Sequence, residues 1–107
     1  MSEQPLFGLK PQITQALCDV LRRFPQVGRA VVYGSRALGK HKPGSDIDLT
    51  LYPSPGQVLQ PCDVADIAEA IDELLLPYQV DLSAYDLIDL PDLRQHIDRV
   101  GRVLYAR

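Results

Sequence analysis

The chain has 107 residues, of which 46% are hydrophobic and 23% are charged, a balance typical of a soluble globular protein. This length predicts one domain, residues 1–107, with a single modest core, and the formal net charge of −3 argues against broad nucleic-acid binding, which favours a basic surface. No apolar run approaches the roughly 18 residues of a membrane span, and the first residues lack the pattern of a secretory signal, so we expect a cytoplasmic protein.

The N-terminal third predicts a lead-in, a helix and a strand. Residues 1–10 are typical of a loose lead-in, and Pro11 suits the first turn of a helix. Apolar residues recur at helical spacing between Ile13 and Phe24 and give that helix one hydrophobic face. Residues 26–28 then predict a short turn, and the apolar run 30–33 predicts a buried strand.

A small turn follows this predicted strand. Gly34 permits a sharp bend of the backbone and the close approach of a ligand. Ser35 is a natural N-cap, so residues 36–38 predict a short helical turn. The free N–H groups of that turn, with the Ser35 hydroxyl, would form a cradle for an anion such as a phosphate. Arg36 could bind a phosphate in bidentate fashion or lie in solvent, and the sequence favours neither alternative.

Two aspartates open the next predicted strand, residues 46–52. Residues two apart in a strand point to the same face, so Asp46 and Asp48 are expected to project together. Two carboxylates this close resist joint ionisation unless a cation lies between them. Mg²⁺ or Mn²⁺ is the natural one, because Mg²⁺ is usually held by one or two carboxylates plus substrate phosphates. The turn and the carboxylate pair together indicate a site for a metal–nucleotide complex, with a solvated strand end as the alternative.

Helices and strands alternate through the second half of the chain. Residues 62–76 predict an amphipathic helix, and residues 78–83 predict a third strand. A last helix begins at Pro91, Gly101 is a suitable C-cap, and residues 102–105 predict a short final strand. The alternation predicts an α/β or α+β fold, a mixed sheet of about three to four strands with helices packed mainly on one face.

The combined pattern resembles a known family. Gly34-Ser35, then Gly39, then the run SDIDL at residues 45–49 looks like the signature of the DNA polymerase β-like nucleotidyltransferase superfamily. Within it, the chain resembles the minimal nucleotidyltransferases, whose members include the antitoxin partners of HEPN toxins. The resemblance covers about residues 12–105. One departure is Leu38, where many members place a second basic residue, and this leaves less positive charge beside the phosphates.

This resemblance implies the residues of an active site. It implies a third carboxylate on the strand next to the Asp-x-Asp strand, and Asp81 is the residue at that place, with a surface aspartate on an edge strand as the alternative. Asp46, Asp48 and Asp81 would then be the catalytic residues, holding two metal ions and orienting an attacking hydroxyl. The expected nucleotide-binding residues are Gly34, Ser35, Arg36 and Ser45.

The same resemblance implies a substrate and a partner. It implies ATP as the donor, AMP as the transferred group and a tyrosine of a HEPN-type toxin as the acceptor, in a hetero-oligomer. The chain would then act as an antitoxin. Two alternatives stay open: a non-catalytic binding module that masks its partner, and nucleotidyl transfer to a small molecule.

The sequence predicts structural roles for two polar residues in the last third of the chain. His96 is interpreted as a residue on the surface of the last helix. Asp89, two residues before Pro91, is a plausible cap for that helix.

Overall fold

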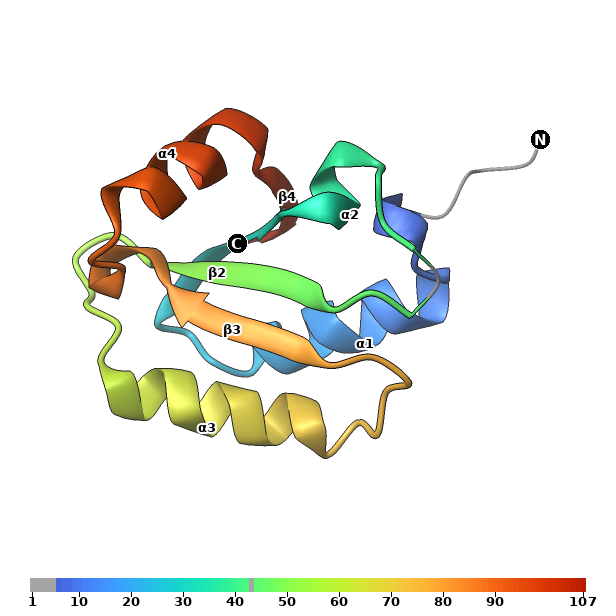
Figure 1. Ribbon diagram of the computed structural model, residues 1–107. Coiled ribbons are helices and arrows are strands. Elements are labelled where there is room, and N and C mark those ends of the chain that lie inside the picture. Colours follow the sequence, from blue (N-terminus) through green and yellow to red (C-terminus); the bar gives the residue numbers. More distant parts are fainter. Residues whose placement is uncertain (1–5, 43) are drawn as a thin grey trace.

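The computed structural model describes residues 6–42 and 44–107, and Figure 1 shows their arrangement. The strands are β1 (Val27–Tyr33), β2 (Ile47–Pro53), β3 (Val80–Ala84) and β4 (Arg102–Ala106). They form one sheet in the order β3–β2–β1–β4. β1 is antiparallel to both β2 and β4, whereas β2 and β3 are parallel. This confirms the predicted mixed sheet.

Helices cover both sides of this sheet. They are α1 (Pro11–Arg22), α2 (Ser35–Leu38), α3 (Pro61–Asp72) and α4 (Pro91–Val100), with 3₁₀ turns η1 (Leu6–Gly8) and η2 (Tyr85–Leu87). The two longest helices, α1 and α3, contact each other on one face, as predicted, and α4 lies on the opposite side against β1 (Figure 1). No helix among the described residues is long and apolar enough to cross a membrane.

β2 shows how the sheet separates apolar from polar residues. The side chains of Ile47, Leu49 and Leu51 are fully buried in the hydrophobic core. Since successive residues of a strand point to opposite faces, Asp48 and Thr50 face away from this core. The face that carries Asp48 is therefore the candidate functional face.

The N-terminal segment contributes more to the fold than predicted. Residues 1–5 of the expected lead-in lie outside the described residues. Beyond them the loose lead-in is wrong, because Phe7 packs against the core and the Leu9 side chain is fully buried. Val27, predicted within a turn, is already the first residue of β1 and pairs with Pro53.

One helix ends earlier than its apolar periodicity predicts. The pattern predicts a helix over residues 62–76, whereas α3 ends at Asp72. Leu75 has a φ of 53° and is 88% exposed, so it takes no part in the apolar face that the pattern suggested.

The two ends of α4 give one confirmed and one wrong prediction. Gly101 is the C-cap, as expected, and a Cβ there would lie 2.5 Å from the Ile97 carbonyl oxygen and 2.6 Å from the Val31 side chain. Glycine therefore allows the end of α4 to pack closely on β1. The predicted cap by Asp89 is wrong, because Leu90 is the N-cap and no side chain caps this helix.

Candidate active site

Three aspartates lie together near the N-terminal ends of β2 and β3. Asp48 on β2 lies directly opposite Asp81 on β3 in the parallel register, and Asp46 immediately precedes β2. The pKa of Asp48 is raised, first by burial and then by the nearby carboxylates of Asp81 and Asp46. The structure thus brings together the three acidic residues that the sequence singled out.

The donor set of these aspartates fits a hard divalent cation. The carboxylates of Asp81 and Asp46 raise the pKa of Asp48, and a cation between such groups would relieve their repulsion. Among residues 6–42 and 44–107, no group of three or more acidic, histidine or cysteine side chains is placed so that it could hold a metal ion by itself. A cation at these aspartates would therefore need further ligands, and Mg²⁺ usually takes one or two carboxylates and obtains others from substrate phosphates.

The glycine–serine turn lies against this acidic group. Gly34, with φ 76° and ψ −154°, is the N-cap of α2, and the helix begins at Ser35, so the prediction of Ser35 as the cap is wrong. A Cβ at Gly34 would collide with a carboxylate oxygen of Asp48. Only glycine therefore lets the turn approach Asp48, and the first N–H groups of a helix have no partner inside it.

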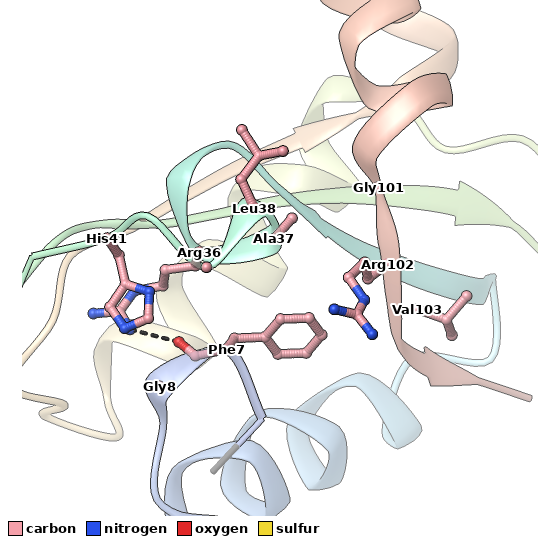
Figure 2. Close-up of a pocket in the computed structure, with 10 residues that line it drawn as sticks. Phe7, Gly8, Arg36, Ala37, Leu38, His41, Gly101, Arg102 and Val103 are labelled. Carbon is pink, nitrogen blue, oxygen red and sulfur yellow. Dashed lines mark hydrogen bonds between the residues drawn. The ribbon is translucent and has the colours of Figure 1, made fainter. Parts of the chain in front are cut away.

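Arg36 has a role that neither predicted alternative describes. The side chain is 3% exposed, so it does not lie in solvent. Its guanidinium donates to the carbonyl oxygen of Ser45 from Nε at 3.1 Å and from Nη2 at 2.7 Å. Its Nη1 donates to the carbonyl oxygen of Phe7 at 2.7 Å, as Figure 2 shows. It also lies 4.8 Å from the centre of the Tyr78 ring. These contacts tie α2 to the loop before β2 and to η1.

Ser45 shapes the loop that leads to Asp46. Its hydroxyl oxygen accepts a hydrogen bond from the Lys42 N–H at 2.9 Å, and its own N–H donates to the Lys42 carbonyl at 3.0 Å. Ser35, by contrast, is exposed at the start of α2. Of the two serines, Ser35 is the more accessible to a ligand.

His96 has a role that was not predicted from the sequence. Its Nε2 accepts a hydrogen bond from the Gly34 N–H at 3.2 Å, and its ring stands edge-on to Tyr33 with 6.2 Å between the centroids. Its interpretation as a surface residue is therefore wrong. One signal was available: His96 lies three residues after Leu93 and four before Val100, both apolar, and such spacing places all three on one side of a helix.

A column of aromatic and basic side chains attaches α4 to the sheet farther from the carboxylates. Tyr52 stacks on Tyr85 with centroids 4.9 Å apart, and the guanidinium of Arg29 lies 4.2 Å from the Tyr52 ring. Arg94 of α4 lies 4.6 Å from the Tyr85 ring, and the Tyr85 hydroxyl donates to Asp98 at 2.8 Å. The helix that carries His96 is therefore held to the sheet by several polar contacts.

A pocket between α2 and the N-terminal segment lies apart from the three aspartates. It has a volume of about 900 Å³ and lies between η1, α2 and the junction of α4 with β4 (Figure 2). Figure 2 shows the Phe7 ring and the Arg102 guanidinium within it. The residues that line it are Phe7, Gly8, Arg36, Ala37, Leu38, Gly39, His41, Gly101, Arg102 and Val103. None of them is a carboxylate, so we place the candidate chemistry at the aspartates and not in this cavity.

Comparison with known families identifies the domain. The sequence matches the family described as "Polymerase beta, Nucleotidyltransferase" over residues 15–107. The chain belongs to this family. The match confirms the superfamily and the enzyme class, nucleotidyltransferase, that the motif predicted. No curated protein matches the sequence at a significant level.

Solved structures share the fold over most of this chain. A toxin–antitoxin structure with AMP-PNP is 21% identical with a TM-score of 0.70, and the match covers 88% of this chain and 73% of that chain. A tri-AMPylated Shewanella oneidensis HEPN toxin in complex with its MNT antitoxin gives 18% identity and a TM-score of 0.67, with 92% and 74% covered. A candidate minimal nucleotidyltransferase gives 25% identity and a TM-score of 0.65, with 94% and 98% covered. The predicted likeness to minimal nucleotidyltransferases is thus confirmed for the fold.

Proposed function

We propose that this chain is a metal-dependent adenylyltransferase that transfers AMP from ATP to a tyrosine of a HEPN-type toxin and thereby acts as its antitoxin in the cytoplasm. The observation that carries the proposal is Asp48, which lies opposite Asp81 and against the Gly34 turn. Family membership supports nucleotidyl transfer. The choice of AMP and of a HEPN partner is supported by similar structures, one with AMP-PNP and one with an AMPylated HEPN toxin.

The exposure of the aspartates suggests how the two substrates would be arranged. Asp48 is half-buried beside Gly34, so the nucleotide phosphates would lie on this side of the site. Asp81 is exposed on β3, which is an edge strand, so the acceptor would approach over that edge. Asp46, Asp48 and Asp81 would hold one or two Mg²⁺ or Mn²⁺ ions. Bound there, the cation would neutralise phosphate charge and lower the pKa of the acceptor hydroxyl.

The transfer itself exchanges a phosphoanhydride bond of ATP for a phosphoester bond to the acceptor. The acceptor oxygen forms a bond to the α-phosphorus of ATP, and the bond from that phosphorus to the oxygen bridging to the β-phosphate breaks, which releases pyrophosphate. The hydroxyl proton passes to a carboxylate oxygen of Asp81. The Ser35 hydroxyl and the first N–H groups of α2 hold the β and γ phosphates, with the residues of the turn fixed by the Arg36 contacts.

A label-transfer experiment tests this function. The chain is incubated with a HEPN-type toxin, Mg²⁺ and ATP labelled at the α-phosphate. We expect label on a tyrosine of the partner, loss of that label with Asp46→Asn, and full labelling with Asp66→Asn, which changes an exposed aspartate on α3. A partner that is inhibited but unlabelled would contradict the proposal and support masking. Label on small molecules alone would support a small-molecule acceptor.

A further inference from the structure

We infer that His96 is a positioning residue for the nucleotide-binding turn: it holds the Gly34 peptide in the orientation that presents Ser35 and the start of α2 to the phosphates. The inference rests on the proposed function, since it assumes that nucleotide binds at this turn. Its direct basis is the hydrogen bond from the Gly34 N–H to His96 Nε2 at 3.2 Å. His96 acts through Gly34: no hydrogen bond among the described residues joins it to the three aspartates, and a charge on its ring would act on Asp48 only by partly offsetting the raised pKa of that carboxyl.

The backbone N–H that follows the end of β1 needs a hydrogen-bond acceptor from outside the sheet. β1 pairs with β4 only as far as Val32, opposite Arg102, and with β2 as far as Tyr33, opposite Asp48. Gly34 follows directly in a conformation, φ 76°, that lies outside the strand region. A half-buried N–H without a partner is unfavourable, and His96, which comes from the helix that leads into β4, supplies the acceptor.

His96 is itself held in place. The T-shaped contact with Tyr33, at an interplanar angle of 80°, fixes the plane of the imidazole. One residue later, Ile97 is 2% exposed and anchors α4 on the sheet. The contacts of Tyr85 with Arg94 and Asp98 hold the helix from the other side. An acceptor at Nε2 also requires that the proton of the neutral ring lie on Nδ1.

This arrangement separates binding from chemistry. The Gly34 peptide sets the direction of the Ser35 hydroxyl and of the first helical N–H groups, which are expected to contact the phosphates. Loss of the His96 acceptor would free this peptide and weaken nucleotide binding. The carboxylates would keep their strand register, because Asp48 and Asp81 are paired through β2 and β3 and not through α4. We therefore expect a higher KM for ATP with little change in kcat.

Two substitutions of His96 separate the hydrogen bond from packing. His96→Phe keeps a ring against Tyr33 but has no acceptor, and His96→Gln offers an amide oxygen at a similar reach. We expect His96→Phe to raise the KM for ATP and the Kd for AMP-PNP by about three- to tenfold, the range given by the net value of one hydrogen bond. His96→Gln should restore both, and Gln95→Ala, at the exposed neighbouring position, should match the unsubstituted chain.

The Gly34 amide provides a readout independent of activity. In ¹H–¹⁵N spectra, its proton resonance should move upfield and exchange faster with solvent in His96→Phe, and recover in His96→Gln. If the unsubstituted chain binds AMP-PNP and His96→Phe binds it equally well, the inference is wrong and the proposed function stands. If the unsubstituted chain binds no nucleotide, the proposed function fails, and the inference fails with it. A Kd raised equally in both His96 variants would indicate a purely structural residue and would also overturn it.

Discussion

The two faces of the sheet differ in what their residues contribute, although the same strands supply both. On the face packed against α1 and α3, Leu49 and Leu51 are fully buried among apolar neighbours. On the other face, Asp48 is half-buried between other carboxylates, and its pKa is raised. Along β2, a residue that stabilises the fold therefore alternates with one that is unfavourable for it. The comparison teaches that Asp48 lowers the stability of the strand at the place where the proposed function needs it, whereas its apolar neighbours on the other face stabilise the fold.

Substitution of Asp48 should have the largest effect on AMP transfer. It should not lower the free energy of unfolding. With Asp48→Asn, we expect AMP transfer to fall on the order of a thousandfold, the size typical of losing a group that stabilises transition-state charge. The free energy of unfolding at neutral pH should stay the same or increase, because a carboxylate with a raised pKa is removed. Label transfer and urea unfolding check the two parts. Asp72→Asn, at the exposed end of α3, is the control. Retained transfer or a marked destabilisation would contradict the comparison.

The adjacent core residue should behave in the opposite way. Leu49→Ala removes a fully buried side chain, and we expect a loss of about 2–5 kcal/mol in the free energy of unfolding. Leu75→Ala, at a position that is 88% exposed, should change stability by less than about 0.5 kcal/mol. Urea denaturation measures both. Similar values for the two variants would mean that the face toward α1 and α3 is not the source of stability.

Two glycines with similar φ values allow the contact between the Gly34 turn and Asp48 to be tested. Gly34 and Gly39, which flank α2, have φ values of 76° and 71°. A Cβ at Gly39 would meet no atom within 4 Å, so Gly39→Ala should lose only about 1–2 kcal/mol through the left-handed conformation. Gly34→Ala should lose more stability and also nearly all AMP transfer, because its Cβ would displace the Asp48 carboxylate. Equal effects on stability and transfer would show that the contact between Gly34 and Asp48 is unimportant.

The hydroxyl groups of Ser83 and Thr50 allow the polar face to be tested without substitution of a carboxylate. The Ser83 hydroxyl donates to Thr50 Oγ1 at 3.0 Å, and Thr50 is fully buried. Ser83→Ala should lower the free energy of unfolding by about 1 kcal/mol. The double variant Ser83→Ala/Thr50→Val should lose less than the sum of the single ones, because both polar partners are then absent. Additive losses in thermal or urea unfolding would argue against this pairing.

The smallest expected effect is a dependence of stability on pH. Since the pKa of Asp48 is raised in the folded state, the native chain binds more protons than the unfolded chain between the unfolded pKa, about 4, and the folded value. The contribution of Asp48 to stability is therefore fully present below about pH 4 and is lost as the pH rises through the folded pKa. Relative to Asp48→Asn, the unsubstituted chain should lose stability across this window, by a modest amount because Asp48 is partly exposed. If the free energy of unfolding changed with pH in the same way in both proteins, the raised pKa of Asp48 would be contradicted.

The strand that carries Asp46 and Asp48 was predictable because its alternation of polar and apolar residues has a local cause. Alternation along residues 46–52 places Ile47 and Leu49 in the core and Asp48 on the other face, as the structure shows. The position of Asp81 opposite Asp48 was expected only from the family resemblance, because no local pattern fixes the register between β2 and β3. The cap of α2 was misplaced by one residue, because the preference of serine for N-cap positions competes with the need for glycine at the positive φ of Gly34.

Long-range contacts account for what the sequence could not predict. The spacing of Leu93, His96 and Val100 gives the inner side of α4, but not the part of the sheet that this side meets, so the bond from Gly34 to His96 had no local signal. Arg36 was equally unpredictable, because the carbonyl groups that it contacts belong to Ser45 and Phe7, on either side of α2. His96 was assigned to the helix surface and Arg36 to either a phosphate or solvent, and in both cases tertiary structure gave the side chain a backbone partner from a distant part of the sequence.

Metal-dependent nucleotide binding tests the central claim most directly. ATP is titrated into the chain by calorimetry, with and without Mn²⁺, and the same titrations are made with Asp48→Asn. We predict measurable binding only with Mn²⁺ present, and its loss in Asp48→Asn, since the cation requires both the carboxylates and the phosphates. Equal binding with and without Mn²⁺, or binding that survives Asp48→Asn unchanged, would contradict the assignment of the three aspartates and the Gly34 turn as one metal–nucleotide site.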